Sequence, residues 1–128
     1  MKNFLIAFLV FLAIDMIWLG FIGKSLYQKY LGYLMTDKIN WIAALTFYIL
    51  FIIGLLIFVI NPALLQKSLN KAIFYGALYG LITYATYDLT NLATIKNWPL
   101  TITIIDLFWG TFLSTAVSLI TFLISKKI

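Results

Sequence analysis

The 128-residue chain contains no histidine, no cysteine, no arginine and no glutamate. Without histidine and cysteine it lacks the usual ligands of zinc and haem, a thiol nucleophile and the base of a Ser-His-Asp triad, so we expect no metal site and no cofactor. Charged residues make up only 10% of the chain, whereas a soluble domain carries about 25%. This composition excludes a soluble globular protein, a disordered chain and a disulfide scaffold.

Hydrophobic residues account for 64% of the sequence, and the mean hydropathy is +1.06. A helix that crosses a bilayer needs about 20 mostly apolar residues. Four stretches meet this requirement, at about residues 3–22, 41–60, 72–94 and 101–124. Residues 1–128 are therefore predicted to form a single transmembrane domain, an all-α integral membrane protein built as a bundle of four transmembrane helices.

The longest connection, residues 23–40, has a helical pattern of its own. Lys24, Gln28 and Lys29 fall between apolar and aromatic residues that recur at helical spacing. This pattern predicts a short amphipathic helix in the membrane interface, which either anchors the bundle or forms a lid over a site. The apolar side comprises Leu26, Tyr27, Tyr30, Leu31, Leu34 and Met35.

The nine lysines lie at the ends of the apolar stretches, in the connections or near the termini, and form no basic stripe. The net charge of +5 therefore does not indicate nucleic-acid binding, and lipid headgroups are the expected partners. With four spans, five lysines share the side of the termini and four lie on the other side. The positive-inside rule then places both termini in the cytoplasm.

Three of the four aspartates, Asp15, Asp88 and Asp106, interrupt apolar stretches. A carboxyl group at the centre of a membrane helix costs about 2.5–3.5 kcal/mol. Counted from the predicted helix ends at about 1.5 Å per residue, all three lie roughly 8–11 Å below the same face of the membrane. We expect them to form one site in which at least one carboxyl group is protonated at neutral pH, or which holds a proton or a cation. Alternatively, each is a hydrogen-bonded strut between helices.

Polar and aromatic residues accompany these aspartates at helical spacing. Tyr84 and Asn91 lie on the same face of the third helix as Asp88, and Tyr87 flanks that face. A D-x-x-W pattern occurs twice, ending at Trp18 and at Trp109. No residue is assigned a catalytic role. The candidate substrate- or ion-binding residues are Asp15, Trp18, Tyr84, Tyr87, Asp88, Asn91, Asp106 and Trp109.

The third helix also contains Gly76-x-x-x-Gly80, a spacing that lets another helix approach closely. The pattern is as typical of packing within one bundle as of a dimer.

The stretch YATYDLTNLAT at residues 84–94, together with Trp98-Pro99-Leu100 and DLFWGT at residues 106–111, resembles the signature of a known family. That family comprises predicted four-helix prokaryotic integral membrane proteins, a domain of unknown function. The resemblance covers nearly the whole chain. It implies four membrane helices and a prokaryotic inner membrane, and it supplies no activity.

Two better understood families match only in part. Small multidrug resistance exporters are similar in size and use one acid in the first helix to exchange protons for cationic drugs. Asp15 has a comparable place, but Asp88 and Asp106 depart from that pattern. Intramembrane aspartyl proteases use a Tyr-Asp pair, which Tyr87-Asp88 resembles, but residues 104–106 lack their second motif.

Three functions remain open from the sequence. The first is proton- or cation-linked transport of a small solute, for which a homodimer is expected because a chain of this length encloses little volume. The second is a membrane-embedded enzyme that uses aspartate acid/base chemistry on a lipid or isoprenoid, with tyrosines and tryptophans lining an apolar pocket. The third is a non-catalytic subunit of a larger complex. What fills the space between the three aspartates distinguishes these functions.

Overall fold

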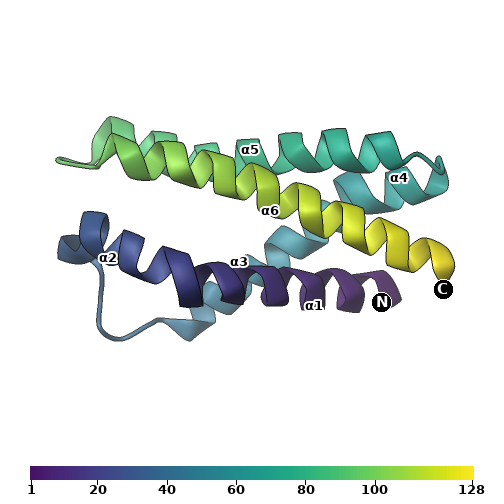
Figure 1. Ribbon diagram of the computed structural model, residues 1–128, viewed down its shortest axis with the longest axis horizontal. Coiled ribbons are helices and arrows are strands. Elements are labelled where there is room, and N and C mark those ends of the chain that lie inside the picture. Colours follow the sequence, from purple (N-terminus) through teal and green to yellow (C-terminus); the bar gives the residue numbers. More distant parts are fainter.

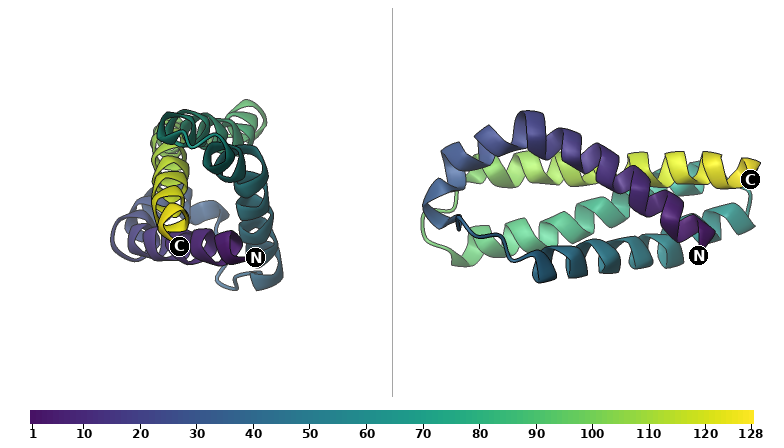
Figure 2. Two further views of the ribbon diagram at one scale, coloured as in Figure 1. Left: turned by 90° about the vertical axis from the view of Figure 1, so that its right-hand side faces the viewer. Right: turned by 90° about the horizontal axis from the view of Figure 1, so that it is seen from below.

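The computed structural model describes all 128 residues, which form helices joined by short turns (Figure 1). The four long helices are α1 (Lys2–Ile17), α3 (Trp41–Leu55), α5 (Leu69–Thr94) and α6 (Leu100–Lys127). Viewed along the long axis, they stand around a rough square (Figure 2). Both termini lie at one end of the bundle, together with α4 (Asn61–Leu65), whereas α2 (Lys24–Leu31) lies at the other end.

Three helical stretches are long and apolar enough to cross a membrane: Lys2–Leu34, Trp41–Leu65 and Leu100–Lys127. The fourth helix, α5, has 26 residues and is therefore about 39 Å long. Its tyrosines, threonines, asparagines and Asp88 make it less apolar than the others, but it lies alongside α6 over most of its length. The predicted all-α membrane bundle of four helices is confirmed.

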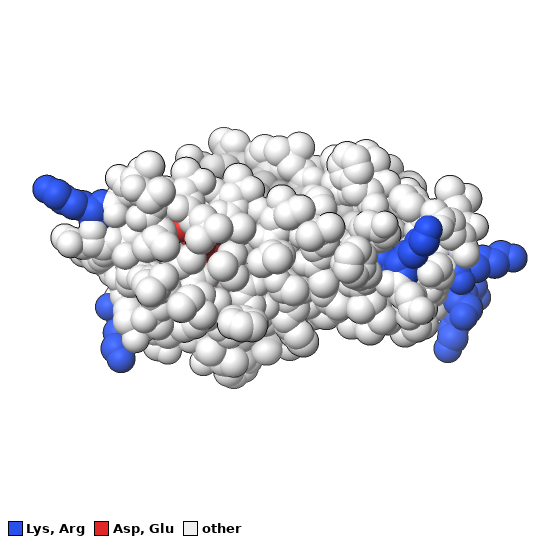
Figure 3. All heavy atoms as spheres, turned by 90° about the horizontal axis from the view of Figure 1, so that it is seen from above, with Lys and Arg blue, Asp and Glu red and all other residues white.

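On the face shown in Figure 3, basic side chains lie toward the two ends and the middle is nearly free of charge. Between the ends large hydrophobic side chains are exposed, including Phe58 at 69% and Phe108 at 76%. In water such a surface would drive association, whereas in a bilayer it faces hydrocarbon. By their positions along the chain, Lys2, Lys67, Lys71, Lys126 and Lys127 belong to the side of the termini, and Lys24, Lys29, Lys38 and Lys96 belong to the other side.

The first helix is longer than predicted. From α1 it continues without a break through a π-helical segment, η1 (Trp18–Gly23), into α2, and it ends in the 3₁₀ turn η2 (Gly32–Leu34). The predicted amphipathic helix is present, with Leu31 buried and Lys24 exposed. It extends the first span instead of lying apart from it, because no proline interrupts residues 18–31. The wider π turns accompany a bend between α1 and α2 (Figure 2).

The second helix extends beyond residue 60, where the predicted second stretch ends. The π-helical segment η3 (Leu56–Ile60) and then α4 continue the helix as far as Leu65. Pro62 stands in the first turn of α4, where a missing N–H is tolerated. The chain reverses later, at Lys67 with its φ of 52°. Ser68 then caps α5 by accepting a hydrogen bond from the backbone N–H of Lys71 at 3.2 Å.

The largest apolar core lies in the half of the bundle nearest the termini. It contains residues from α1, α3, η3 and α6, namely Ala7, Phe11, Phe51, Ile52, Leu55, Leu56, Val59, Ile60, Leu113 and Val117. In the other half, a smaller cluster of Leu31, Trp98 and Ile102 packs α2 against the α5–α6 turn. The main apolar core meets the region of the aspartates through Tyr48, Tyr84 and Trp109, which pack against it.

The glycines of α5 allow this helix to pack closely against α6. A Cβ atom on Gly76 would lie 2.8 Å from the hydroxyl oxygen of Ser118. A Cβ atom on Gly80 would overlap the carbonyl oxygen of Gly110. The Gly76-x-x-x-Gly80 pattern therefore serves packing within the bundle.

We expect Gly80→Ala to lower the free energy of unfolding by about 1–3 kcal/mol, because the added methyl group has no room between α5 and α6. Gly20→Ala is the matched control, since no atom lies within 4 Å of a Cβ at that position. Thermal unfolding in detergent, followed by circular dichroism, measures both variants. Equal melting temperatures would contradict the close packing described here.

Candidate functional site

The three aspartates on the apolar helices are buried. Asp88 on α5 is 0% exposed, and Asp15 on α1 and Asp106 on α6 are 6% and 5% exposed. Figure 3 shows a small patch of acidic atoms in the otherwise uncharged middle of the molecule, toward the α2 end. Their contacts decide whether they act together.

Asp88 and Asp106 form a pair across the α5–α6 interface. Their carboxyl groups are close neighbours. Both carboxyl oxygens of Asp88 are buried without a hydrogen-bond partner. A carboxylate can only accept hydrogen bonds, so two carboxyl groups bond to each other only when one carries a proton. The arrangement is therefore suited to holding one proton between the two helices.

The turn between α5 and α6 supports this pair from the side. The indole N–H of Trp98 donates to the hydroxyl of Thr103 at 3.0 Å. The Thr103 hydroxyl in turn donates to the backbone oxygen of Asp88 at 3.5 Å. All three residues are buried, so these bonds fix the start of α6 against α5 next to the acidic pair.

Tyr27 of α2 covers Asp106. Its hydroxyl donates to Oδ1 of Asp106 and accepts a hydrogen bond from the indole N–H of Trp18 at 3.3 Å. The Trp18 ring is stacked on Trp109, with ring centroids 4.4 Å apart and planes inclined by 13°. The two copies of the D-x-x-W pattern thus meet through their tryptophans. These contacts hold α2 against the bundle beside Asp106.

Asp15 stands apart from the pair. It accepts a hydrogen bond from the hydroxyl of Tyr48 on α3 at 3.4 Å, and the Trp109 indole lies beside it. Tyr84 lies among the three aspartates. No three acidic side chains are close enough together to hold a metal ion. The three carboxyl groups therefore occupy one region of the bundle without converging on one point, as a pair and a single group.

The other predicted site residues lie around this region. The ring of Tyr84 fills the space that a side chain at Gly110 would need. Tyr87 lies at the rim, 57% exposed, with its ring packed edge-on against Trp98. Asn91 neighbours Tyr87, and no hydrogen bond joins it to an aspartate.

Sequence reasoning missed two tyrosines that bind the aspartates. Tyr27 and Tyr48 each donate a hydrogen bond to a carboxyl group from a different helix. A signal for Tyr27 was present, because it belongs to the apolar side of the amphipathic helix. Tyr30 belongs to the same side, however, and the spacing does not show which of the two reaches Asp106.

A cavity of about 450 Å³ adjoins the acidic pair. Its wall is mostly apolar and aromatic, and Asp106 is the only charged residue in it. The lining residues are Tyr27, Leu31, Met35, Phe47, Thr83, Tyr84, Tyr87 and Asp106. Asp88 is buried and does not line the cavity, so one acid of the pair meets the cavity and the other does not.

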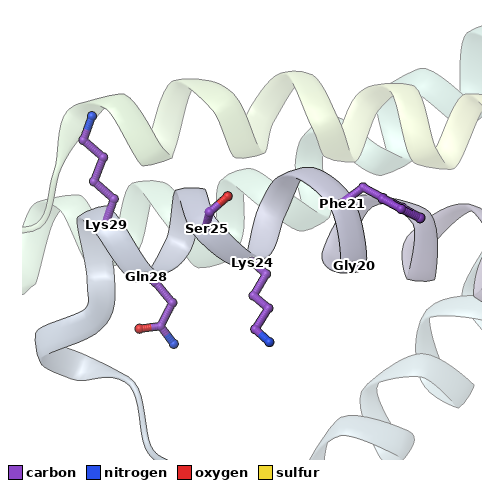
Figure 4. A pocket seen from close by; sticks show the side chains of 6 residues that line it. All are labelled: Gly20, Phe21, Lys24, Ser25, Gln28 and Lys29. Atoms are coloured by element: carbon purple, nitrogen blue, oxygen red, sulfur yellow. The ribbon is translucent and has the colours of Figure 1, made fainter.

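A second hollow of about 590 Å³ lies on the outer side of η1 and α2 (Figure 4). All its lining residues, Gly20, Phe21, Lys24, Ser25, Gln28 and Lys29, belong to one continuous helix. Lys24 and Lys29 point in opposite directions in Figure 4. This hollow is an open surface groove and includes none of the aspartates.

The apolar middle, the basic ends and the four-helix bundle define an integral membrane protein. A family model described as predicted membrane protein (DUF2177) matches residues 1–123. The chain therefore belongs to this family of membrane proteins of unknown function, as the resemblance indicated. No curated protein and no solved structure matches it.

We expect Tyr27→Phe to destabilise the protein by about 1–3 kcal/mol, because it removes the hydroxyl that joins Trp18 to Asp106. Tyr30→Phe on the same helix is the matched control, since its hydroxyl makes no hydrogen bond to the protein. Chemical unfolding in detergent, followed by tryptophan fluorescence, compares the two variants. If both unfold at the same denaturant concentration, α2 is not held by this hydrogen bond.

Proposed function

We propose that the protein carries out proton-linked transport of a small solute that binds in the cavity beside Asp106. The observation that supports this most directly is the position of the acidic pair. Asp106 contributes to the cavity wall, whereas Asp88 is completely buried and does not line the cavity. A solute in the cavity can thus reach the carboxyl group of Asp106, whereas a proton on Asp88 is out of its reach.

The charge of this pair suits it to the exchange of a proton for a solute. No lysine or arginine lies in the middle of the bundle, so a negative charge on the pair has no fixed counter-charge. A second proton or a positively charged solute can neutralise it, and the two then compete for Asp106. By linkage, each weakens the binding of the other by the same factor. Such competition is what couples a solute to a proton gradient.

The lid supplies a means of access. Tyr27 contributes to the cavity wall and also bonds to Asp106. Displacing α2 would break that bond and widen the cavity. The π-helical segment at Trp18–Gly23, where the helix bends, is a suitable hinge.

In liposomes with an imposed pH gradient, we expect Asp106→Asn and Asp88→Asn to reduce proton-coupled flux at least tenfold. Each substitution removes a titratable group and leaves the side-chain size nearly unchanged. Asp37→Asn, in the exposed first loop, is the matched control. A pH-sensitive dye inside the liposomes reports proton release after addition of sodium, potassium or a quaternary ammonium ion.

Wild-type flux in the Asp15, Asp88 and Asp106 variants would show instead that the aspartates are struts. No flux from correctly folded wild-type protein with any of these cations would rule the transport function out.

A second candidate is a membrane-embedded enzyme acting on a lipid or isoprenoid. The aromatic and apolar cavity wall favours it, because it suits a hydrocarbon chain and can stabilise a carbocation. A substrate that must be held by its phosphate fits poorly, since no arginine and no central lysine is present to bind it. A lipid that co-purifies and is converted by the wild type, but not by Asp106→Asn, would favour this function over transport.

We also propose that the termini face the cytoplasm of a prokaryotic cell, on the basis of the five lysines at that end against four at the other. The chain has no cysteine, so a single introduced cysteine is its only thiol. In intact cells, a membrane-impermeant maleimide is expected to label Lys38→Cys and to spare Lys71→Cys. The reverse labelling pattern would place the termini outside.

A further inference from the structure

We infer that the cavity beside Asp106 binds an organic ammonium cation with an apolar body. This inference rests on the proposed transport function for the role of the site, and it specifies the chemical class of the solute. It follows from three properties of the cavity wall: its single charge, its aromatic content and its lack of other ion ligands.

The charge of the wall selects a cation. Asp106 is the only charged residue among the eight lining residues. Asp15 is held elsewhere by Tyr48, and Asp88 is buried and does not line the cavity. A neutral hydrocarbon ligand would leave a carboxyl group facing apolar atoms, which is unfavourable. An anionic ligand would meet no positive partner.

The rest of the wall selects an organic cation over a metal ion. Metal ions such as Ca²⁺ and Mg²⁺ require about six oxygen ligands, but no group of three acidic side chains is close enough to bind one. Half of the lining residues are aromatic: Tyr27, Phe47, Tyr84 and Tyr87. Aromatic rings attract weakly hydrated cations such as quaternary ammonium groups, and they also accommodate an apolar body.

The lining comes from several elements, so the cavity is an assembled site. Tyr27 and Leu31 belong to α2, Phe47 to α3, Tyr84 and Tyr87 to α5, and Asp106 to α6. Met35, just after η2, adds a flexible apolar side chain that can adapt to ligands of different shape. The single carboxyl group fixes the position of the charged head, and the apolar wall holds the body.

The test uses benzyltrimethylammonium and its uncharged isostere neopentylbenzene, in which carbon replaces nitrogen. Isothermal titration calorimetry with purified protein in detergent is expected to show saturable binding of the cation. We expect the isostere to bind at least tenfold more weakly. Asp106→Asn should weaken cation binding at least tenfold, and Asp37→Asn should leave it unchanged.

The aromatic wall is tested separately with two exposed tyrosines of α5. Tyr87→Leu removes a ring that lines the cavity, whereas Tyr75→Leu removes one that does not. Only the first is expected to weaken cation binding, by about threefold or more. This pair keeps the inference falsifiable if Asp106→Asn does not fold.

Because the cation has no proton to lose, the pH dependence of its binding reports on the protein. Affinity is expected to fall as pH is lowered, since protons then compete for the acidic pair. The titratable groups that surround Asp106 are Tyr27 on α2 and Tyr84, Tyr87 and Asp88 on α5. Asp106→Asn should abolish this dependence.

Equal affinity for the cation and its isostere, or unchanged affinity in both Asp106→Asn and Tyr87→Leu, would overturn this inference. Proton-coupled flux of another cation would then still support the transport function. Conversely, cation binding that depends on Asp106, without any flux, would uphold the ligand class and count against transport. The experiments therefore distinguish failure of the proposed ligand class from failure of the proposed transport function.

Discussion

A carboxyl group buried in an apolar helix needs either a proton or hydrogen-bond donors, and this chain has no basic residue in its middle to help. The partners of the three aspartates accordingly come from other elements. Asp15 on α1 bonds to Tyr48 of α3, Asp106 on α6 bonds to Tyr27 of α2, and Asp88 faces Asp106. Satisfying the buried acids therefore ties all the long helices together at the α2 end of the bundle.

The two halves of the bundle are held together differently. Near the termini, large apolar side chains fill the space between α1, α3 and α6. Along α5 and α6, small residues allow the backbones to approach, as Gly80 does against Gly110. That approach also brings Asp88 and Asp106 together, because they stand two turns beyond Gly80 on α5 and one turn before Gly110 on α6. The close helix packing and the acidic pair are thus consequences of the same interface.

Much of the architecture could be predicted from two known quantities, the thickness of the bilayer and the rise per residue of an α-helix. These two quantities predict four spans and a common depth for the three aspartates. Helix ends were less predictable: Pro62 fits within the first turn of α4, and no residue between α1 and α2 breaks the helix. The role of Tyr27 could not be read from the sequence. Tyr27 and Tyr30 share the apolar side of α2, and the spacing of apolar residues does not show which of them bonds to Asp106.

The two interpretations of the aspartates, as struts or as a site, need not exclude one another. Asp15 does not line the cavity, and its neighbours Tyr48 and Trp109 hold it between helices, which is the arrangement of a strut. The Asp88–Asp106 pair differs because two acids are neighbours there and one of them lines the cavity. A group whose partners are all fixed donors gains little from a ligand. A group whose partner is another acid has a charge that changes with its proton, and that is the property a coupled binding site requires.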